Sequence, residues 1–374
     1  MITKNNSINP LISSDELKIK FAEFARNSNS RLSIILGAGA SYGYSRNTNY
    51  IYRPPTVYEL LKNDNPLVNE VIENPKHYAI KGQRAHIERS IKGLNGDLEA
   101  YLSDIYANDT ADNLFPSMLQ YLEDIFTLAS QRIDLDDNHY QSLLNRVRDL
   151  RGTKPWSIIT FNYDTLLEQS LVNIPRFIPR RTFLTDNNYL DQNPKVLKMH
   201  GSVNLRYITI PPSKKENATS SHDIFTEMMS RKESVENYLE VKGLGLSVPS
   251  FQDYRRFKDG LHTTYNFPLM MIPIHTAVRS ENSFFKRQIE YAKSDISESK
   301  LVLAIGYQFG DNTFIDALKD LNLKESALIL IGSKHLLEKT IESKAYREAS
   351  KAWPKENIKI YDKDGFGNFT NALY

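Results

Sequence analysis

The chain has 374 residues and a net charge of +2, from 47 basic and 45 acidic residues, so it offers no overall electrostatic case for binding nucleic acid. It has no cysteine, which excludes disulfides, cysteine nucleophiles and thiolate zinc sites. The amino terminus lacks the apolar core of a signal peptide and no apolar run is long enough to span a membrane, so we expect a cytoplasmic protein that binds no membrane.

At roughly 100–200 residues per domain, the length predicts two domains, or one domain with insertions. Residues 1–12 are polar and are expected to be loose. Ser14 is a candidate N-cap for a helix over 14–27. The run 32–36 is rich in Ile and Leu, which predicts a strand buried on both faces.

From 56 to 150 the apolar residues recur at helical spacing, which predicts a helical insertion over 46–150. Residues 206–265 are polar and mixed, and we expect them to form a second insertion or a lid. The other apolar runs predict strands, with 269–273 as the weakest of them. These runs are 155–161, 195–199, 269–273, 300–306, 327–332 and 358–361.

Strands that alternate with helices predict an α/β fold. We expect a Rossmann-like parallel sheet of about six strands, flanked by helices and built from 1–45 and 151–374, with the helical insertion after the first strand.

Small or polar residues follow four of the predicted strands. They are Gly37-Ala38-Gly39-Ala40-Ser41, Asn162-Tyr-Asp164, His200-Gly201-Ser202 and Gly306-Tyr307-Gln-Phe-Gly-Asp311. In an open parallel sheet, ligands bind at the carboxyl ends of the strands. The first motif alone is a weak fingerprint for a dinucleotide, because Tyr42 stands where the third glycine should be. Four such ends together predict a ligand site.

These four motifs, in this order, resemble those of sirtuin-like domains. The closer likeness is to a bacterial branch that degrades NAD in anti-phage defence. The resemblance covers about residues 30–335, and it implies a role for each motif. Residues 37–41 would hold the pyrophosphate, Asn162 and His200 would be catalytic, and Asp164 would sit in the Asn162 motif. Gly201 and Ser202 belong to the His200 motif and are expected to contact NAD. Gly306, Tyr307, Asp311 and Gly332 would surround the adenosine half.

The residue types suit cleavage of the nicotinamide–ribose bond, which builds positive charge on the sugar. A neutral amide at Asn162 can fix a ribose hydroxyl or a water, and a histidine exchanges protons near neutral pH. Purely structural roles are also possible for these three residues. Asn162 could cap the next helix, His200 could be a core histidine, and Asp164 could stabilise a helix N-terminus.

The remaining histidines show no partner pattern. His77, His86, His139, His222 and His335 are expected at the surface, while His275, with Arg279 four residues on, could reach the site.

Two departures from protein-deacylating sirtuins affect the expected activity. With no cysteine, the four-cysteine zinc module is absent, and no metal is expected. Tyr42-Gly-Tyr-Ser45 replaces the usual continuation of the first motif. Both favour plain NAD hydrolysis, with NAD as substrate. The alternatives are a non-catalytic NAD or ADP-ribose sensor or scaffold, and an NAD-dependent deacylase or ADP-ribosyl transferase.

The resemblance also implies partners. Stand-alone sirtuin-like proteins of this length resemble those that pair with a hexameric HerA-type ATPase, and a short Argonaute is the second precedent. A homo-oligomer is expected, with activation by a separate partner.

Overall fold

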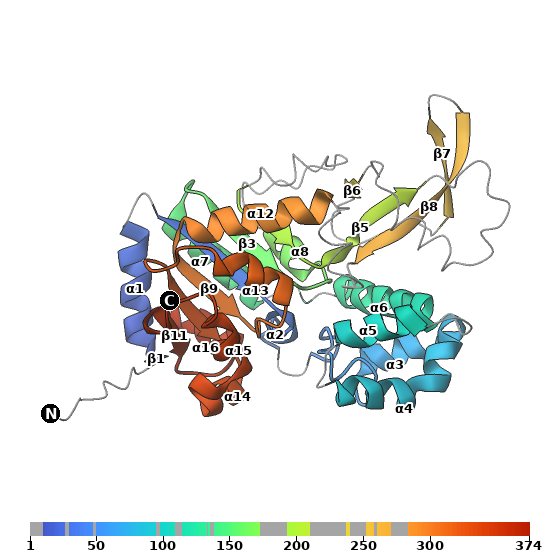
Figure 1. Ribbon diagram of the computed structural model, residues 1–374, viewed down its shortest axis with the longest axis horizontal. Helices are drawn as coiled ribbons and strands as arrows, with labels where there is room; N and C mark the ends of the chain where they lie inside the picture. The colour runs from blue at the N-terminus through green and yellow to red at the C-terminus, as the bar shows by residue number, and fades with distance from the viewer. Residues whose placement is uncertain are drawn as a thin grey trace.

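The computed structural model describes residues 10–26, 30–47, 50–94, 98–108, 114–132, 134, 138–172, 193–209, 237–239, 252–257, 260–270 and 283–374. They include a parallel sheet in the order β1-β11-β10-β9-β2-β3-β4. This sheet lies with its helices in the left part of Figure 1. The strands are β1 (Leu11–Ile12), β2 (Arg31–Leu36), β3 (Trp156–Thr160), β4 (Lys195–Lys198), β9 (Ser299–Ile305), β10 (Ala327–Ile331) and β11 (Ile358–Tyr361). The predicted α/β fold with a parallel sheet is confirmed.

The described sheet has seven strands rather than the expected six, because residues 11 and 12 form an edge strand. Leu11 pairs with Ile360 of β11, and the amide of Ile360 donates to the carbonyl of Pro10 at 2.6 Å. The expectation that residues 1–12 are loose is therefore wrong for 11–12. Two residues carry no periodicity, so only the pairing with β11 reveals this strand.

Two groups of helices accompany the parallel sheet. α12 (Ser283–Ser297) contacts β2, β3, β4 and β9, and α13 (Asn312–Lys319) lies beside it. A second group, α1 (Ser14–Arg26), α16 (Gly365–Ala372), α7 (His139–Arg151) and α8 (Leu166–Val172), is connected by successive contacts. After β10 come α14 (Lys334–Lys339), α15 (Lys344–Ala349) and short 3₁₀ turns at Thr340–Glu342 and Lys355–Asn357.

The start of α1 differs by one residue from the prediction. Ser13 accepts from the amide of Glu16 at 3.3 Å, and the Glu16 carboxylate accepts from the amide of Ser13 at 2.9 Å. This reciprocal pair is a capping box, so Ser13 is the N-cap and not Ser14.

Four further helices form a second hydrophobic cluster. They are α3 (Pro66–Ile72), α4 (Tyr78–Gly93), α5 (Leu98–Asn108) and α6 (Leu114–Gln131), with a 3₁₀ turn at Pro75–His77. Asn65 starts α3 by accepting from the amides of Leu67 and Val68. The next helix, α7, packs instead with the sheet through Tyr140, Leu143 and Val147. The domain division at residues 46–150 stays a prediction.

A second sheet follows β4 directly. Its antiparallel order is β6-β5-β8-β7, formed by β5 (Gly201–Thr209), β6 (Asn237–Leu239), β7 (Gln252–Phe257) and β8 (Gly260–Met270). The described part of 206–265 therefore forms strands, which its mixed polar sequence did not indicate. Of the run 269–273, residues 269 and 270 end β8 in this antiparallel sheet, and 271–273 lie outside the described residues. Val203 and Met270 join the helical cluster, so β5 and β8 contact it.

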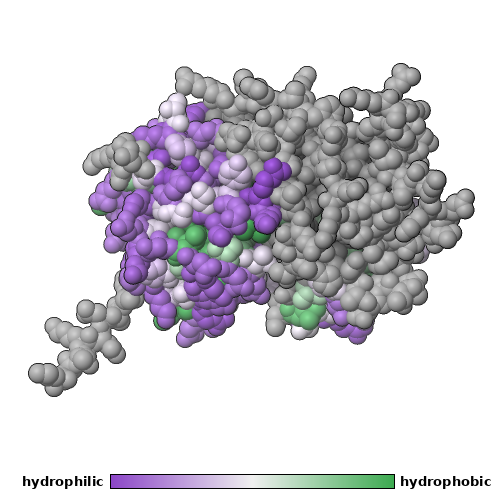
Figure 2. All heavy atoms as spheres, turned by 45° about the horizontal axis from the view of Figure 1, so that its top comes forward, coloured by the Kyte–Doolittle hydropathy of each residue, from purple (hydrophilic) through white to green (hydrophobic). Residues whose placement is uncertain are grey.

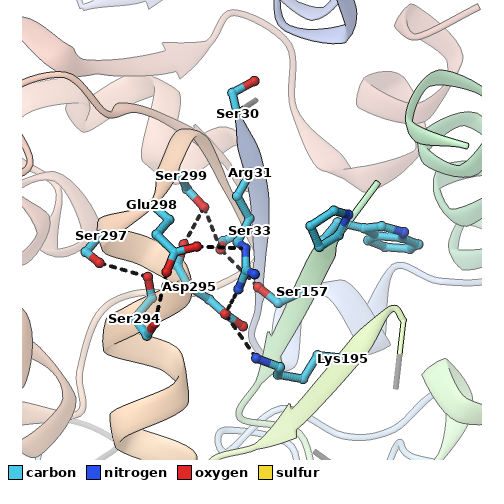
Figure 3. A network of polar contacts seen from close by, with 12 residues as sticks. Ser30, Arg31, Ser33, Ser157, Lys195, Ser294, Asp295, Ser297, Glu298 and Ser299 are labelled. Carbon is cyan, nitrogen blue, oxygen red and sulfur yellow. Dashed lines mark hydrogen bonds and ion pairs between the residues drawn. The ribbon is translucent and has the colours of Figure 1, made fainter. Parts of the chain in front are cut away.

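A buried polar network holds the starts of the parallel strands together (Figure 3). Asp295, near the end of α12, is fully buried and forms ion pairs with Arg31 of β2 and Lys195 of β4, the latter at 3.1 Å. The Ser33 hydroxyl bonds to those of Ser157 (3.0 Å) and Ser299 (2.8 Å). The end of α12 and the serine hydroxyls thus together link four neighbouring strands, β9, β2, β3 and β4, near their starts.

The described surface is mainly hydrophilic on the face that Figure 2 shows. Among the described residues, the most exposed large hydrophobic side chains are Tyr78 of α4, Ile19 of α1 and Tyr374, which follows α16. Among the described helices, none has the length and apolar content needed to cross a bilayer.

Candidate active site

The four predicted motifs meet where the strand order of the parallel sheet reverses. β2 lies between β3 and β9, and β4 follows β3. The chain leaves β2, β3, β4 and β9 at the same edge of the sheet, through residues 37, 161, 199 and 306. A crevice at the carboxyl ends of strands, beside such a reversal, is where open α/β sheets bind ligands.

The glycines of the first motif pack against the backbone of the fourth. A Cβ on Gly37 would lie 2.5 Å from the Gly306 carbonyl oxygen, and one on Gly39 would lie 2.9 Å from the Gly306 Cα. The amide of Gly37 donates to Ile305 and that of Gly39 to Gly306. These glycines thus allow close contact between the residues that follow β2 and β9. Residues 38–42 form the short helix α2 (Ala38–Tyr42), and Ala38 and Gly39 at its start are exposed. We refer to Gly37 and the first turn of α2 as the glycine loop. Contact with a pyrophosphate stays a prediction.

Asn162 is turned toward this glycine loop. Its Nδ2 donates to the Gly37 carbonyl at 3.0 Å and to the Ser41 hydroxyl at 2.8 Å. Because a carbonyl oxygen only accepts, the nitrogen end must face Gly37. Both amide hydrogens are then engaged inside the protein, and the side chain offers a ligand its Oδ1 as an acceptor.

His200 is held by a carboxylate. Its Nε2 lies 3.0 Å from Oδ2 of Asp311, and the other carboxylate oxygen of Asp311 accepts from the amide of Phe314 at 3.0 Å as the N-cap of α13. Both side chains are almost fully buried. A carboxylate on one ring nitrogen fixes the orientation of the imidazole. Asp311, predicted near the adenosine half, therefore contacts His200; its contact with adenosine stays a prediction.

Aromatic rings form a wall beside His200. Phe161 stacks on Tyr307, with ring centroids 4.1 Å apart and planes at 13°. The rings of His200 and Phe161 are nearly perpendicular, with centroids 5.0 Å apart, and the Tyr163 ring centroid lies 6.0 Å from that of His200. This wall joins the motifs that follow β3, β4 and β9, and sequence reasoning had included only Tyr307.

Asp164 stabilises the start of α8. Its Oδ1 accepts from the amide of Leu166 at 3.1 Å, and its side chain is buried. Burial raises the pKa of this carboxyl, although Lys198 and Ser41 act in the opposite direction. Stabilisation of the next helix start, considered above for both Asn162 and Asp164, is therefore the role of Asp164. Asn162 contacts the glycine loop instead.

A buried lysine, Lys198, contacts Asp164 and was not predicted as a site residue. Lys198 Nζ donates to the main-chain carbonyl of Asp164 at 2.6 Å and lies 3.1 Å from Oε1 of Glu168. Burial raises the pKa of Glu168 above its ordinary value of 4.5, and the Lys198 charge offsets this only in part. The available signal was a lysine at the end of a predicted strand, two residues before His200.

Tyr140 of α7 was also missed. Its hydroxyl lies 3.0 Å from the Ser41 hydroxyl, and the ring is buried. Burial is the main cause that raises the Tyr140 pKa well above its usual value, and the nearby Asp164 adds to it. The hydroxyl therefore stays protonated and supports Ser41. Nothing in the helical periodicity of α7 distinguishes this tyrosine from a core residue.

The remaining predicted site residues have structural contacts of their own. Gly201 has φ 73° at the start of β5, and the Ser202 hydroxyl donates to the carbonyl of Tyr163 at 2.9 Å. Ala40 is buried. Gly332 leaves room for Leu336 of α14, which a Cβ would meet at 2.7 Å. Roles in ligand binding at these positions stay predictions.

Two of the histidines expected at the surface are buried. His77 lies 2.6 Å from Asp124, and His139 lies 2.8 Å from Thr370. Each buried imidazole has a polar partner, which offsets the cost of its burial. These partners are distant in the sequence, so the positions of the histidines along the chain could not reveal them. His86 is exposed as expected. The side chain of His335, together with His222, His275 and Arg279, lies outside the described residues. Within the described part, no three His, Asp or Glu side chains gather as a metal site.

Comparison with known proteins gives one family. A model of the SIR2-like domain matches residues 156–361. No curated protein matches the sequence. Similar solved structures include a Sir2 homologue–NAD complex (13% identity, TM-score 0.41, covering 95% of this chain and 91% of that one). Another is a Sir2 homologue variant with ADP-ribose (12% identity, TM-score 0.42, covering 95% and 94%).

The backbone contact between the first and fourth motifs yields a prediction for Gly306. At φ 61°, a Cβ on Gly306 would lie 2.3 Å from the Ala40 amide nitrogen. Gly306→Ala should lower the free energy of unfolding by more than the roughly 1–3 kcal/mol expected from backbone strain alone, as measured by chemical denaturation. Gly365→Ala is the matched control, because Gly365 has φ 79° but open space around its Cβ position. Equal losses in both variants would contradict this packing constraint.

Glu168 yields a prediction for pH dependence. Since its pKa is raised in the folded state, its contribution to stability is complete below about 4.5 and is lost as pH rises through the folded-state pKa. Wild type should therefore lose stability relative to Glu168→Gln as pH increases above this value, as measured by denaturation from pH 4 to pH 8. Glu325, whose pKa is lowered by Lys300, should show a small effect of the opposite sign in Glu325→Gln. A flat difference for Glu168→Gln would refute the assignment.

Proposed function

Because this chain belongs to the SIR2-like domain family, we propose that it is an NAD glycohydrolase that cleaves NAD to nicotinamide and ADP-ribose. The observation that carries the proposal is the pairing of two groups at the sheet edge. Asn162, whose amide nitrogen is held by Gly37 and Ser41, presents its amide oxygen, and His200 is held by Asp311. NAD is the substrate, and the motifs after β2 and β9 are its proposed binding edge.

The chemistry requires few groups. The bond between nicotinamide and C1′ of the ribose breaks, its electron pair leaves with nicotinamide, and positive charge develops on the sugar. Asn162 Oδ1 can accept from a ribose hydroxyl or the attacking water without a change of charge. Water adds at C1′ and loses a proton, which His200 can take as general base. The products are nicotinamide, ADP-ribose and a proton.

The absence of cysteine from the sequence supports hydrolysis over deacylation. A protein-deacylating sirtuin holds a four-cysteine zinc module, which this chain cannot build. The deacylase or ADP-ribosyl transferase remains an alternative, as does a subunit that binds NAD or ADP-ribose without cleaving it.

The wider role follows from the resemblance of the motifs. We propose a cytoplasmic effector of bacterial anti-phage defence that depletes NAD. It would act as a homo-oligomer under the control of a separate protein, a HerA-type hexameric ATPase or, as second choice, a short Argonaute. The mass in solution, alone and with each candidate, tests the assembly.

Incubation of the purified protein with NAD, with and without candidate partners and an acetylated peptide, separates these activities. Nicotinamide and ADP-ribose should appear without the peptide. Asn162→Ala or His200→Ala should lower this rate by at least about 100-fold, because each removes a group that acts in the transition state. His86→Ala, at an exposed histidine of α4, should keep wild-type activity. Nicotinamide release only with the peptide would favour the deacylase, and tight NAD binding without products would favour the sensor.

Asp311→Asn tests the support of His200 separately from folding. Asparagine keeps an oxygen that can accept from the Phe314 amide, so the cap of α13 should survive. The charge beside His200 is lost, and NAD cleavage should fall by about 100-fold with a nearly unchanged melting temperature. Asp316→Asn, an exposed change on the same helix, is the control. Full activity in Asp311→Asn would show that the carboxylate does not assist His200.

A further inference from the structure

Lys198 is an unusual residue for its position. It ends β4, two residues before His200, and its side chain is only 1% exposed. Lysines are almost never fully buried unless their charge is paired. The proposed cleavage of NAD gives this ammonium no direct role, so its burial beside the site needs another explanation.

The ammonium connects the elements that carry the two proposed catalytic side chains. It donates to the main-chain carbonyl of Asp164 at 2.6 Å, in the loop that begins with Asn162. Its counter-ion is Glu168 of α8, at 3.1 Å, the helix that follows this loop. The main-chain carbonyl of Lys198 accepts from Nε2 of Gln288 on α12 at 3.0 Å, which fixes β4 at this point.

We propose that Lys198 is a positioning residue of the active site, whose buried ammonium fixes the Asn162 loop to the end of β4, two residues before His200. The inference rests on the proposed NAD cleavage, because it assigns Lys198 the task of holding Asn162 and His200 on either side of the nicotinamide ribose. A loop carbonyl needs such a donor, since residues 163–165 lie outside strand and helix and lack a regular hydrogen-bond ladder.

The other end of β4 offers a natural comparison. Lys195 also pairs with a buried carboxylate, Asp295, at 3.1 Å (Figure 3). That pair holds the starts of the strands, away from the proposed ligand. Both lysines thus contribute an ion pair on the same strand, but only Lys198 binds the loop of Asn162. Loss of either ion pair should therefore lower stability, whichever of the two lysines is replaced. Only replacement of Lys198 should also lower the rate of catalysis.

The test compares Lys198→Met with Lys195→Met. Lys198→Met should fold, because Glu168 can take up a proton once the cation is gone; Lys198→Met/Glu168→Gln removes both charges as a second variant. The folded fraction comes from thermal denaturation, NAD affinity from calorimetry, and kcat from nicotinamide release under conditions in which wild type is active. We expect kcat per folded molecule to fall by about 10- to 100-fold in both Lys198 variants, as a displaced catalytic group would cause. The dissociation constant for NAD should change by less than about threefold, and Lys195→Met should keep kcat.

Other outcomes separate the inference from the proposed function. If wild type cleaves NAD and both Lys198 variants keep its kcat, Lys198 is structural and the inference is wrong. An equal fall of kcat in Lys195→Met would also overturn it, because the effect would then follow from any lost ion pair. If wild type cleaves no NAD under any condition tested, the proposed function fails and the inference falls with it.

Discussion

The site depends on the close approach of two backbones at the centre of the sheet. The loop after β2 packs against Gly306 so closely that a Cβ on Gly306 would overlap the amide of Ala40. This contact allows the glycine loop and the β9 loop to share one edge, and it leaves Gly37 facing Asn162. A side chain at any of these glycines would separate the loops, and the partners of Asn162 and the stack of Phe161 on Tyr307 would move with them.

Charge buried on both ends of the strands complements this contact. At the amino ends, Asp295 joins β2 and β4 to α12, while at the carboxyl ends Lys198 joins β4 to the loop after β3. Buried ion pairs contribute little net stability on average, because desolvation offsets their attraction. They do, however, penalise any arrangement that leaves a charge unpaired. The residues between these two ends are mainly apolar, apart from the serines of β2, β3 and β9, so such pairs are well suited to fixing the ends of the strands.

The fold could be predicted from sequence because each long apolar run is a strand that is buried on both faces. The runs at 32–36, 300–306 and 327–332 show this pattern clearly, and all three are central strands. The edge strand 11–12 and the antiparallel strands of 201–270 were missed because their pairing, rather than their composition, defines them. The site motifs could be found because each of them directly follows one of the predicted strands. Tyr140 and Glu168 were not found, because they reach the site from helices where the local sequence indicates only core residues. Lys198 was not found, because a lysine at the end of a strand is usually exposed and only the fold shows that this one is buried.

One three-residue motif shows how a structural and a chemical role can be divided between neighbours. A polar residue after a strand often stabilises the helix that follows. In Asn162-Tyr163-Asp164 that role belongs to Asp164, through the amide of Leu166. Asn162 therefore does not cap α8, and its side chain hydrogen-bonds to Gly37 and Ser41 instead. The same division appears at Asp311, where one carboxylate oxygen caps α13 and the other meets His200. The start of α13 therefore orients His200 through Asp311, while Gly37 and Ser41 orient Asn162 and leave the start of α8 to Asp164.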